Sequence, residues 1–182
     1  MTAIAMKFSY YLIIFVWFVH SSAFAGQSSV ELPSIVTSEW DKSEQLGQTK
    51  FSRFGIHIYD ASLWVLSIGN TQASALSIKY ARKISAERLL SSTKKQWKRL
   101  GFADQYPIDA WLQALEKYWP NVNNGDYLIF IASNNGGNSF YSKNRKLGSI
   151  DDQRFGTAFL DIWLSTKSNY QKQRKELLGE NV

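Results

Sequence analysis

The sequence predicts an α+β fold in which a large, mostly antiparallel sheet is covered by a layer of helices. Residues 51–65 alternate between apolar and polar side chains with a period of two, as a half-buried strand does. Two segments with apolar residues at helical spacing come next, and a hairpin and further helical segments follow them. This order of elements indicates separate α and β layers.

The first 25 residues predict a secretory signal peptide. Lys7 precedes an apolar run over residues 10–19, and Ala23 and Ala25 are small residues suited to a cleavage site. The run has about ten residues, whereas a helix that spans a bilayer needs about twenty. Removal of residues 1–25 is therefore favoured over a retained membrane anchor.

The expected mature domain, 26–182, contains no cysteine, so it forms no disulfide and carries no lipid on a cysteine. Export without cysteine suits a bacterial periplasm, which is the location we predict. The chain has 21 Lys and Arg against 15 Asp and Glu, and loss of Lys7 lowers its net charge from +6 to +5. An exported protein rarely meets nucleic acid, so a small acidic or apolar molecule is the expected partner. Peripheral contact with an anionic membrane surface stays open.

The first half of the domain is predicted to form the sheet. Residues 27–43 show little periodicity and are interrupted by Pro33, so we expect an edge strand and a connection there. A turn at 69–70 separates the strand at 51–65 from another at 76–80. The apolar face of the first strand is expected to carry Ser52, Phe54, Ile56 and Ile58. Its polar face is expected to carry Arg53, His57 and Tyr59.

Helices are predicted to follow this sheet. Ser85 is suited to cap the first helix and Gly101 to end it, while Pro107 opens the second and Pro120 ends it. Three tryptophans fall on apolar helical stripes and are expected in the core: Trp97, Trp111 and Trp163.

The last third predicts a hairpin and two more helices. Residues 127–132 are strong strand formers, and 133–138 connect them to a second strand at 139–143. Asp151 or Asp152 begins a helix, where an acidic residue caps the free N–H groups. The charged stretch 168–178 is also expected to be helical.

Motifs for catalysis or metal binding are missing from the sequence. His57 is the only histidine of the mature domain, so no zinc cluster is expected. There is no Gly-x-Ser-x-Gly turn and no cysteine nucleophile, and the paired glycines at 136–137 lie in a hairpin loop. The sequence therefore predicts no metal and no cofactor, and it leaves enzymatic activity undecided.

Four segments resemble the chalcone isomerase-like family, in particular its exported bacterial branch. They are FSRFGIHIYDASLWV at 51–65, KISAERLL at 83–90, FYSKNRKLGSIDD at 140–152 and FLDIWL at 159–164. The resemblance covers residues 45–179, and it implies an open-faced β-sandwich with a ligand cleft between the sheet and the helices. The family includes plant chalcone isomerases, which close a flavanone ring by intramolecular addition, and relatives that bind fatty acids without catalysis.

The resemblance also implies candidate site residues. Catalytic members hold an anionic oxygen with an arginine on an early strand, and a hydroxyl residue and a tyrosine complete the polar network. Ser52 is similar to the strand hydroxyl, Tyr106 to the tyrosine, and Thr157 to a further hydroxyl on a helix. No arginine lies between Gly26 and Ser52, and alternation turns Arg53 away from Ser52. The anion-holding group therefore has no counterpart on the preceding strand.

This missing arginine favours a non-catalytic periplasmic domain that binds a small apolar or fatty-acid-like ligand, because an oxyanion in an apolar cleft needs a fixed positive donor. The alternative is an intramolecular lyase, that is an isomerase, acting on a chalcone-like substrate, with Lys98 or Arg99 replacing the arginine. Another is an interaction protein whose cleft is filled by its own aromatic side chains. The candidate ligand-binding residues are Ser52, Phe54, Ile56, Tyr106 and Thr157, and the weak catalytic candidates are Ser52 and Tyr106.

Overall fold

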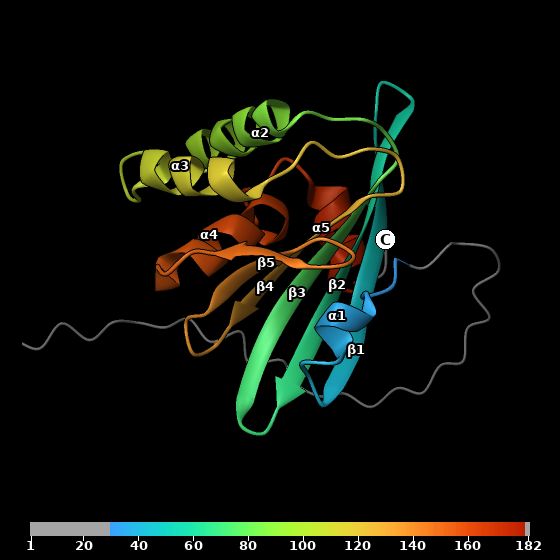
Figure 1. The fold of residues 1–182 in the computed structure, drawn as a ribbon. Helices are drawn as coiled ribbons and strands as arrows, with labels where there is room; N and C mark the ends of the chain where they lie inside the picture. The colour runs from blue at the N-terminus through green and yellow to red at the C-terminus, as the bar shows by residue number, and fades with distance from the viewer. Residues whose placement is uncertain (1–29, 181–182) are drawn as a thin grey trace, which may run out of the picture.

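The computed structural model of the protein describes residues 30–180, and the expected signal peptide, 1–25, lies outside them. The strands form one antiparallel sheet in chain order (Figure 1): β1 (Lys42–Arg53), β2 (Ile56–Ile68), β3 (Thr71–Tyr80), β4 (Tyr127–Ser133), β5 (Asn138–Tyr141) and β6 (Lys146–Ser149). The helices are α1 (Ser34–Thr37), α2 (Ala86–Arg99), α3 (Ile108–Tyr118), α4 (Gln153–Leu164) and α5 (Gln171–Leu177). The predicted α+β class, with a large antiparallel sheet covered by helices, is confirmed.

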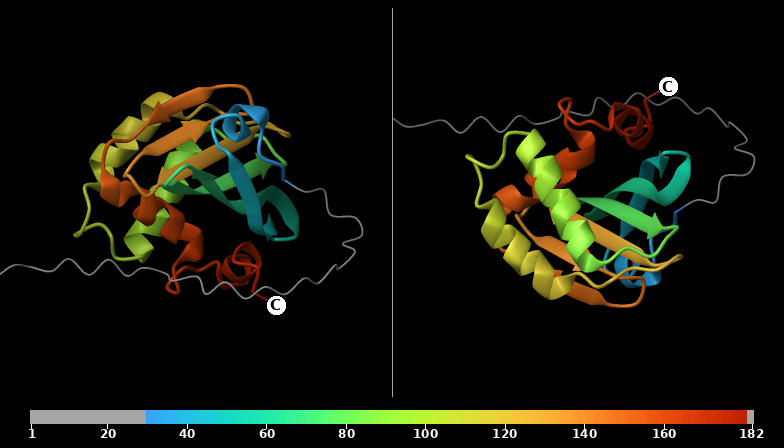
Figure 2. Two further views of the ribbon diagram at one scale, coloured as in Figure 1. Left: turned by 90° about the horizontal axis from the view of Figure 1, so that it is seen from below. Right: turned by 90° about the horizontal axis from the view of Figure 1, so that it is seen from above.

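Successive side chains of each strand point to opposite faces of the sheet. Both faces carry buried apolar residues. Leu76 and Ile78 of β3 pack in the main core together with residues of α2, α3 and α4. Ala73 and Ala75 of the same strand pack in a smaller cluster with Val36 of α1. The four longer helices thus cover one face and α1 covers part of the other, as Figure 2 shows.

The helices begin and end where the sequence predicts. The Ser85 hydroxyl accepts a hydrogen bond from the backbone N–H of Arg88, and the Asp152 carboxylate accepts one from the N–H of Arg154. Pro107 precedes α3, and α5 lies within the predicted helical stretch 168–178. The tryptophans expected in the core, Trp97, Trp111 and Trp163, are all buried.

The single strand predicted over 51–65 is wrong, because this segment is a β-hairpin. Phe54 and Gly55 form a two-residue turn between β1 and β2, with φ angles of 52° and 75°. Positive φ at both positions is the pattern of a type I′ turn, whose twist matches that of the flanking strands. The predicted apolar face is correct at Ile58, which packs against the main core, and wrong at the exposed Phe54 and Ile56. Tyr59, predicted on the polar face, lies in the core beneath the helices.

The described part of the segment 27–43, residues 30–43, holds less strand than we expected. Pro33 precedes the short helix α1, and the edge strand β1 begins only at Lys42. The strand β6 completes the other edge and was not predicted. Among residues 30–180, no helix is long and apolar enough to cross a membrane.

The C-terminal helix α5 packs against β1 at a point where the strand carries a bulge. The pairing with β2 shifts between Gln45 and Gly47, and a Cβ added to Gly47 would lie 2.1 Å from the backbone oxygen of Glu176. Only glycine allows this close approach of two backbones. The hydroxyl of Thr49 also donates a hydrogen bond to the Glu176 carboxylate, which fixes α5 across the edge of the sheet.

Candidate ligand-binding pocket

A pocket of about 230 Å³ lies between the helix-covered face of the sheet and the helices. Its lining comes from strands β1 to β4, from α2 and α4, and from the segments next to them. The sheet supplies Phe51, Arg53, Ile58, Tyr59, Ile78, Tyr80 and Leu128. The helices and connections supply Ile84, Arg88, Leu89, Ser92, Thr93, Gln96, Trp119, Phe159, Ile162, Trp163 and Tyr170.

The inner wall of the pocket is apolar and uncharged. The Tyr59 hydroxyl accepts a hydrogen bond from Nε1 of Trp163 at 2.9 Å, and the Tyr59 ring stacks on Phe51 with centroids 4.9 Å apart. Burial raises the pKa of Tyr59 and of Tyr80 far above that of a free phenol, so both stay neutral. Hydrocarbon groups can therefore pack against this wall without desolvating a charge.

Polar groups gather on the α2 side of the pocket. The Gln96 side-chain N–H donates to the Tyr170 hydroxyl at 2.9 Å, which joins α2 to the segment before α5. Burial raises the pKa of Tyr170, while the positive charges of Arg99 and Arg53 act in the opposite direction. Nε1 of Trp119 is buried and has no hydrogen-bond partner within residues 30–180.

Two arginines stand at the pocket without a carboxylate partner. Arg53, at the end of β1, and Arg88, in the first turn of α2, both line the pocket and are exposed to solvent. Five ion pairs occur within the described residues, and neither of these two guanidinium groups takes part in one. An unpaired guanidinium beside an apolar pocket suits a carboxylate or another planar anion.

None of the predicted site residues lines this pocket. Ser52 is exposed near the end of β1, and Thr157 is exposed on α4. The side chain of Phe54 is 89% exposed at the β1–β2 turn, and that of Ile56 is 47% exposed beside it. Lys98 and Arg99, which we considered as replacements for the missing arginine, do not line it either.

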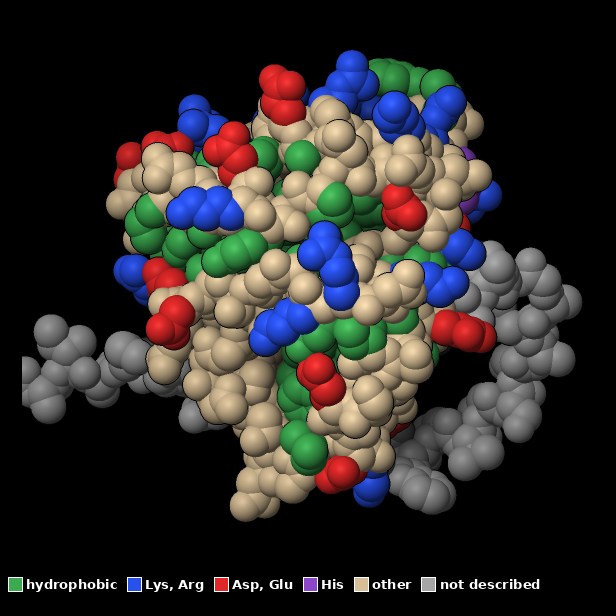
Figure 3. Space-filling view, viewed as in Figure 1, with side chains coloured by type: hydrophobic (Ala, Val, Ile, Leu, Met, Phe, Trp, Pro, Cys, Tyr) green, Lys and Arg blue, Asp and Glu red, His purple; other side chains and the backbone are tan. Residues whose placement is uncertain are grey.

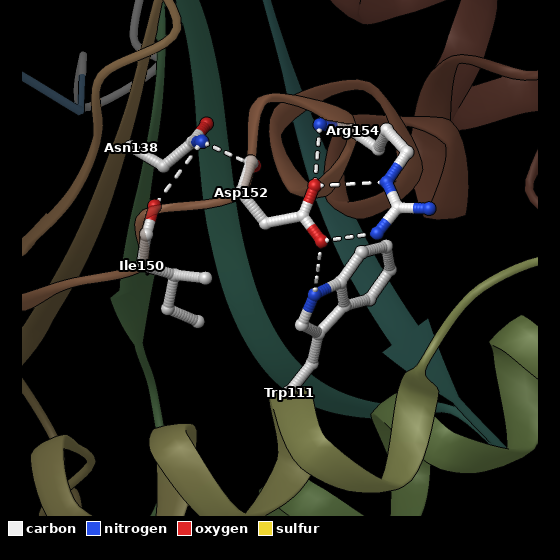
Figure 4. Close-up of polar contacts among 5 residues, drawn as sticks. All are labelled: Trp111, Asn138, Ile150, Asp152 and Arg154. Atoms are coloured by element: carbon white, nitrogen blue, oxygen red, sulfur yellow. Dashed lines mark hydrogen bonds and ion pairs between the residues drawn. The ribbon is translucent and has the colours of Figure 1, made fainter.

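Tyr106 packs against a separate polar network between α3 and α4. Its ring stacks on Trp111 with centroids 5.4 Å apart, and Nε1 of Trp111 donates to the Asp152 carboxylate at 3.1 Å. Arg154 pairs with the same carboxylate at 2.8 Å, as Figure 4 shows, and its hydrogen bonds hold the pKa of Asp152 below the usual value. The buried amide of Asn138 donates to the backbone oxygen of Asp152. These contacts fix the start of α4, so their role is structural.

Sequence reasoning missed the two pocket arginines. A single strand over 51–65, with its apolar face on the side of Ser52, predicts that Arg53 points away from the cleft. Recognition of the turn at 54–55 would have placed Arg53 at the end of a hairpin strand, on the same side as Phe51. Arg88 follows the N-cap Ser85 and carries no motif that distinguishes it from a solvated helix residue.

Three comparisons place the chain among known proteins. A family model described as chalcone isomerase-like matches residues 52–179. An uncharacterized protein of Haemophilus influenzae is 25% identical over 140 residues, which cover 75% of this chain and 68% of that protein. The crystal structure of a fatty-acid binding protein of Arabidopsis thaliana matches with a TM-score of 0.62 at 12% identity, covering 76% of this chain and 88% of the other. At this identity the structural match shows a shared fold.

Proposed function

Since the chain belongs to the chalcone isomerase-like family, we propose that it is a non-catalytic periplasmic protein that binds a small apolar or fatty-acid-like ligand between its sheet and its helices. The observation that carries the proposal is the apolar pocket with the unpaired guanidinium groups of Arg53 and Arg88 beside it. The fatty-acid binding protein with a similar fold adds support.

The form of the pocket favours a ligand with one hydrocarbon chain and one anionic end. The chain would pack against the wall around Tyr59 and Ile78, and the anion would accept hydrogen bonds from the two arginines. A pocket of about 230 Å³ lies between the roughly 150 Å³ that hold benzene and the roughly 300 Å³ at which sites for drug-sized molecules begin. A single-chain acid of medium length suits a site of this size.

The geometry supports binding over the intramolecular lyase alternative. Ser52 and Tyr106, which would polarise a substrate carbonyl, lie outside the pocket and on different elements. A carbonyl held in the pocket would meet Arg53, Gln96 and Tyr170 instead. The volume of the pocket also supports an open cleft over one filled by the protein's own side chains.

The protein isolated from a periplasmic extract is expected to carry an acid that survives gentle purification. Native mass spectrometry should show a chain that begins at Gly26 together with a species heavier by one small acid, which organic extraction then identifies. Detection of a chain that still carries residues 1–25 would contradict the proposed periplasmic location. A protein that is free of ligand and also takes up no added fatty acid would contradict the binding proposal.

Replacing Arg53 and Arg88 together with glutamine should weaken binding of dodecanoate and leave binding of dodecanol nearly unchanged. Each hydrogen bond to a charged group is worth about 1.5–3 kcal/mol, so loss of the pair should raise the Kd of the acid by about 10² or more. Isothermal titration calorimetry with the two ligands measures both values. The preference for the acid over the alcohol should disappear in the variant.

Three further variants accompany this experiment. Lys143→Gln with Arg145→Gln removes the same charge from the exposed β5–β6 turn and should leave both affinities as they are. Leu89→Trp fills the pocket and should abolish binding of acid and alcohol alike, whereas Leu112→Trp on α3, outside the pocket, should not. Equal losses for the two ligands in the arginine variant would rule out carboxylate recognition by these residues.

A further inference from the structure

The tip of the β1–β2 hairpin carries an aromatic residue where the backbone disfavours one. Phe54 has a φ of 52° and a side chain that is 89% exposed. Bulky residues rarely adopt positive φ, and Asn or Gly is strongly preferred in this type of turn. Phe54 is therefore a poor residue for folding alone, since it strains the turn and leaves an apolar ring in water.

A second exposed apolar side chain stands beside this ring. Ile56, just after the turn, is 47% exposed, and the Arg53 guanidinium lies 5.3 Å from the centroid of the Phe54 ring. Figure 3 shows hydrophobic side chains at the top of the molecule, over the hairpin tip, with Lys and Arg side chains next to them. A protruding apolar tip flanked by cations is uncommon on a surface without a partner.

The cations come from three segments that meet at this end of the sheet. The backbone N–H of Ala81 donates to the oxygen of Ile58, which brings the connection after β3 beside the hairpin. The nearby carboxylate of Asp60 is engaged by His57 at 2.9 Å. The exposed cations on the last four residues of β1, on the connection after β3 and in the first turn of α2 are Lys50, Arg53, Arg82, Lys83 and Arg88.

We propose that this hairpin tip docks the protein on an anionic lipid bilayer. Phe54 and Ile56 enter the boundary between headgroups and acyl chains, and the surrounding cations contact lipid phosphates. Stable attachment of a peripheral protein takes two signals, and the tip combines an apolar insertion with a basic patch. Phe54 protrudes from the tip with 89% of its side chain exposed, and the charge of the surrounding cations complements an anionic surface.

Docking in this way sets the pocket against the membrane. Phe51, Arg53 and Ile58 of the same hairpin line the pocket, so a bound bilayer would lie next to its arginines. A single-chain acid could then pass between bilayer and pocket without crossing water. This consequence rests on the proposed function, whereas the docking itself needs no ligand.

The test is sedimentation of the mature protein with vesicles of phosphatidylglycerol and phosphatidylcholine, compared with vesicles of phosphatidylcholine alone. Wild-type protein should bind the anionic vesicles, and binding should fall as salt is added. The double variant Phe54→Asn, Ile56→Ser should bind at least about tenfold more weakly, because it loses the buried apolar area. Its thermal midpoint should not fall, since Asn-Gly suits the turn better than Phe-Gly.

The matched control is Ile68→Ser at the opposite end of β2. Ile68 is 43% exposed beside the turn at 69–70, so its loss removes exposed apolar surface without touching the tip. This variant should bind vesicles like wild type. The proposal is overturned if wild type fails to bind anionic vesicles at low salt, or if the tip variant binds equally well.

Analytical ultracentrifugation separates docking on lipid from self-association. Wild-type protein should remain a monomer, and a dimer that the tip variant abolishes would assign the tip to a second copy and overturn the proposal. Failure of the fatty-acid titration would leave vesicle binding in place. Failure of vesicle binding would leave the titration in place, so the two proposals fail separately.

Discussion

Replacing Trp97 with alanine is expected to lower the free energy of unfolding by about 3–5 kcal/mol, the range for deletion of a large aromatic side chain from a core. Trp97 is fully buried and packs edge-on against Trp111 and Phe155, with centroids 5.5 and 5.9 Å away. Its Nε1 donates to the backbone oxygen of Ala158 at 2.8 Å, so the residue joins α2 to α4. Urea unfolding followed by circular dichroism measures the loss.

Two further variants show whether packing is the cause. Trp97→Phe keeps most of the ring volume and removes the hydrogen bond, so its loss should be clearly smaller than that of alanine. Trp64→Ala, on the opposite face of the sheet, removes a half-buried ring and should also cost less. Equal losses for Trp64→Ala and Trp97→Ala would contradict a core position for Trp97.

Replacing Gly47 with valine should destabilise the protein by about 3 kcal/mol, the upper part of the range for overpacking. Even the first added carbon would lie 2.1 Å from the oxygen of Glu176 and 2.6 Å from that of Leu177. Both atoms belong to the backbone, so α5 must move as a whole. Because Tyr170 directly precedes α5 and lines the pocket, binding of dodecanoate should weaken as well.

Gly137→Ala provides the control for this variant. A Cβ at Gly137 would meet a side-chain oxygen of Asn135 at 3.3 Å and Ser133 at 3.8 Å, so small adjustments can accommodate it. We expect a change within about 0.5 kcal/mol, as for ordinary surface substitutions. If Gly47→Val left both the unfolding free energy and the affinity unchanged, the close packing of α5 on β1 would be refuted.

Sequence patterns predicted the elements whose signals are local. Ser85 and Asp152 lie at helix N-caps as expected, and Leu76, Ile78 and Tyr80 of β3 face the core. The resemblance to a known family supplied the arrangement of sheet and helices, which periodicity alone leaves open. The turn at 54–55 was missed because Phe54 is not a turn residue. The register shift between Phe51 and Ser52, which brings both Ile58 and Tyr59 to the pocket, was not predicted either.

The pocket could not be assembled from the sequence because its walls come from distant parts of the chain. Arg53 and Arg88 meet there only through the pairing of β1, β2 and β3 and the packing of α2. Tyr170 reaches the pocket through the packing of α5 on β1. The candidates taken from the family pattern, such as Ser52 and Thr157, depended on register and helix phase, which a shift of one residue changes.

The order of the strands has a consequence for how the chain can acquire its structure. Each strand pairs with its neighbour in sequence. All of these pairs need only short loop closures except β3 with β4, which α2 and α3 separate in the chain. The bond between Thr49 and Glu176 spans 127 residues instead and carries a larger entropy of closure. Strand pairing can therefore begin while the chain is still emerging, whereas the edge of β1 stays uncovered until the last helix arrives.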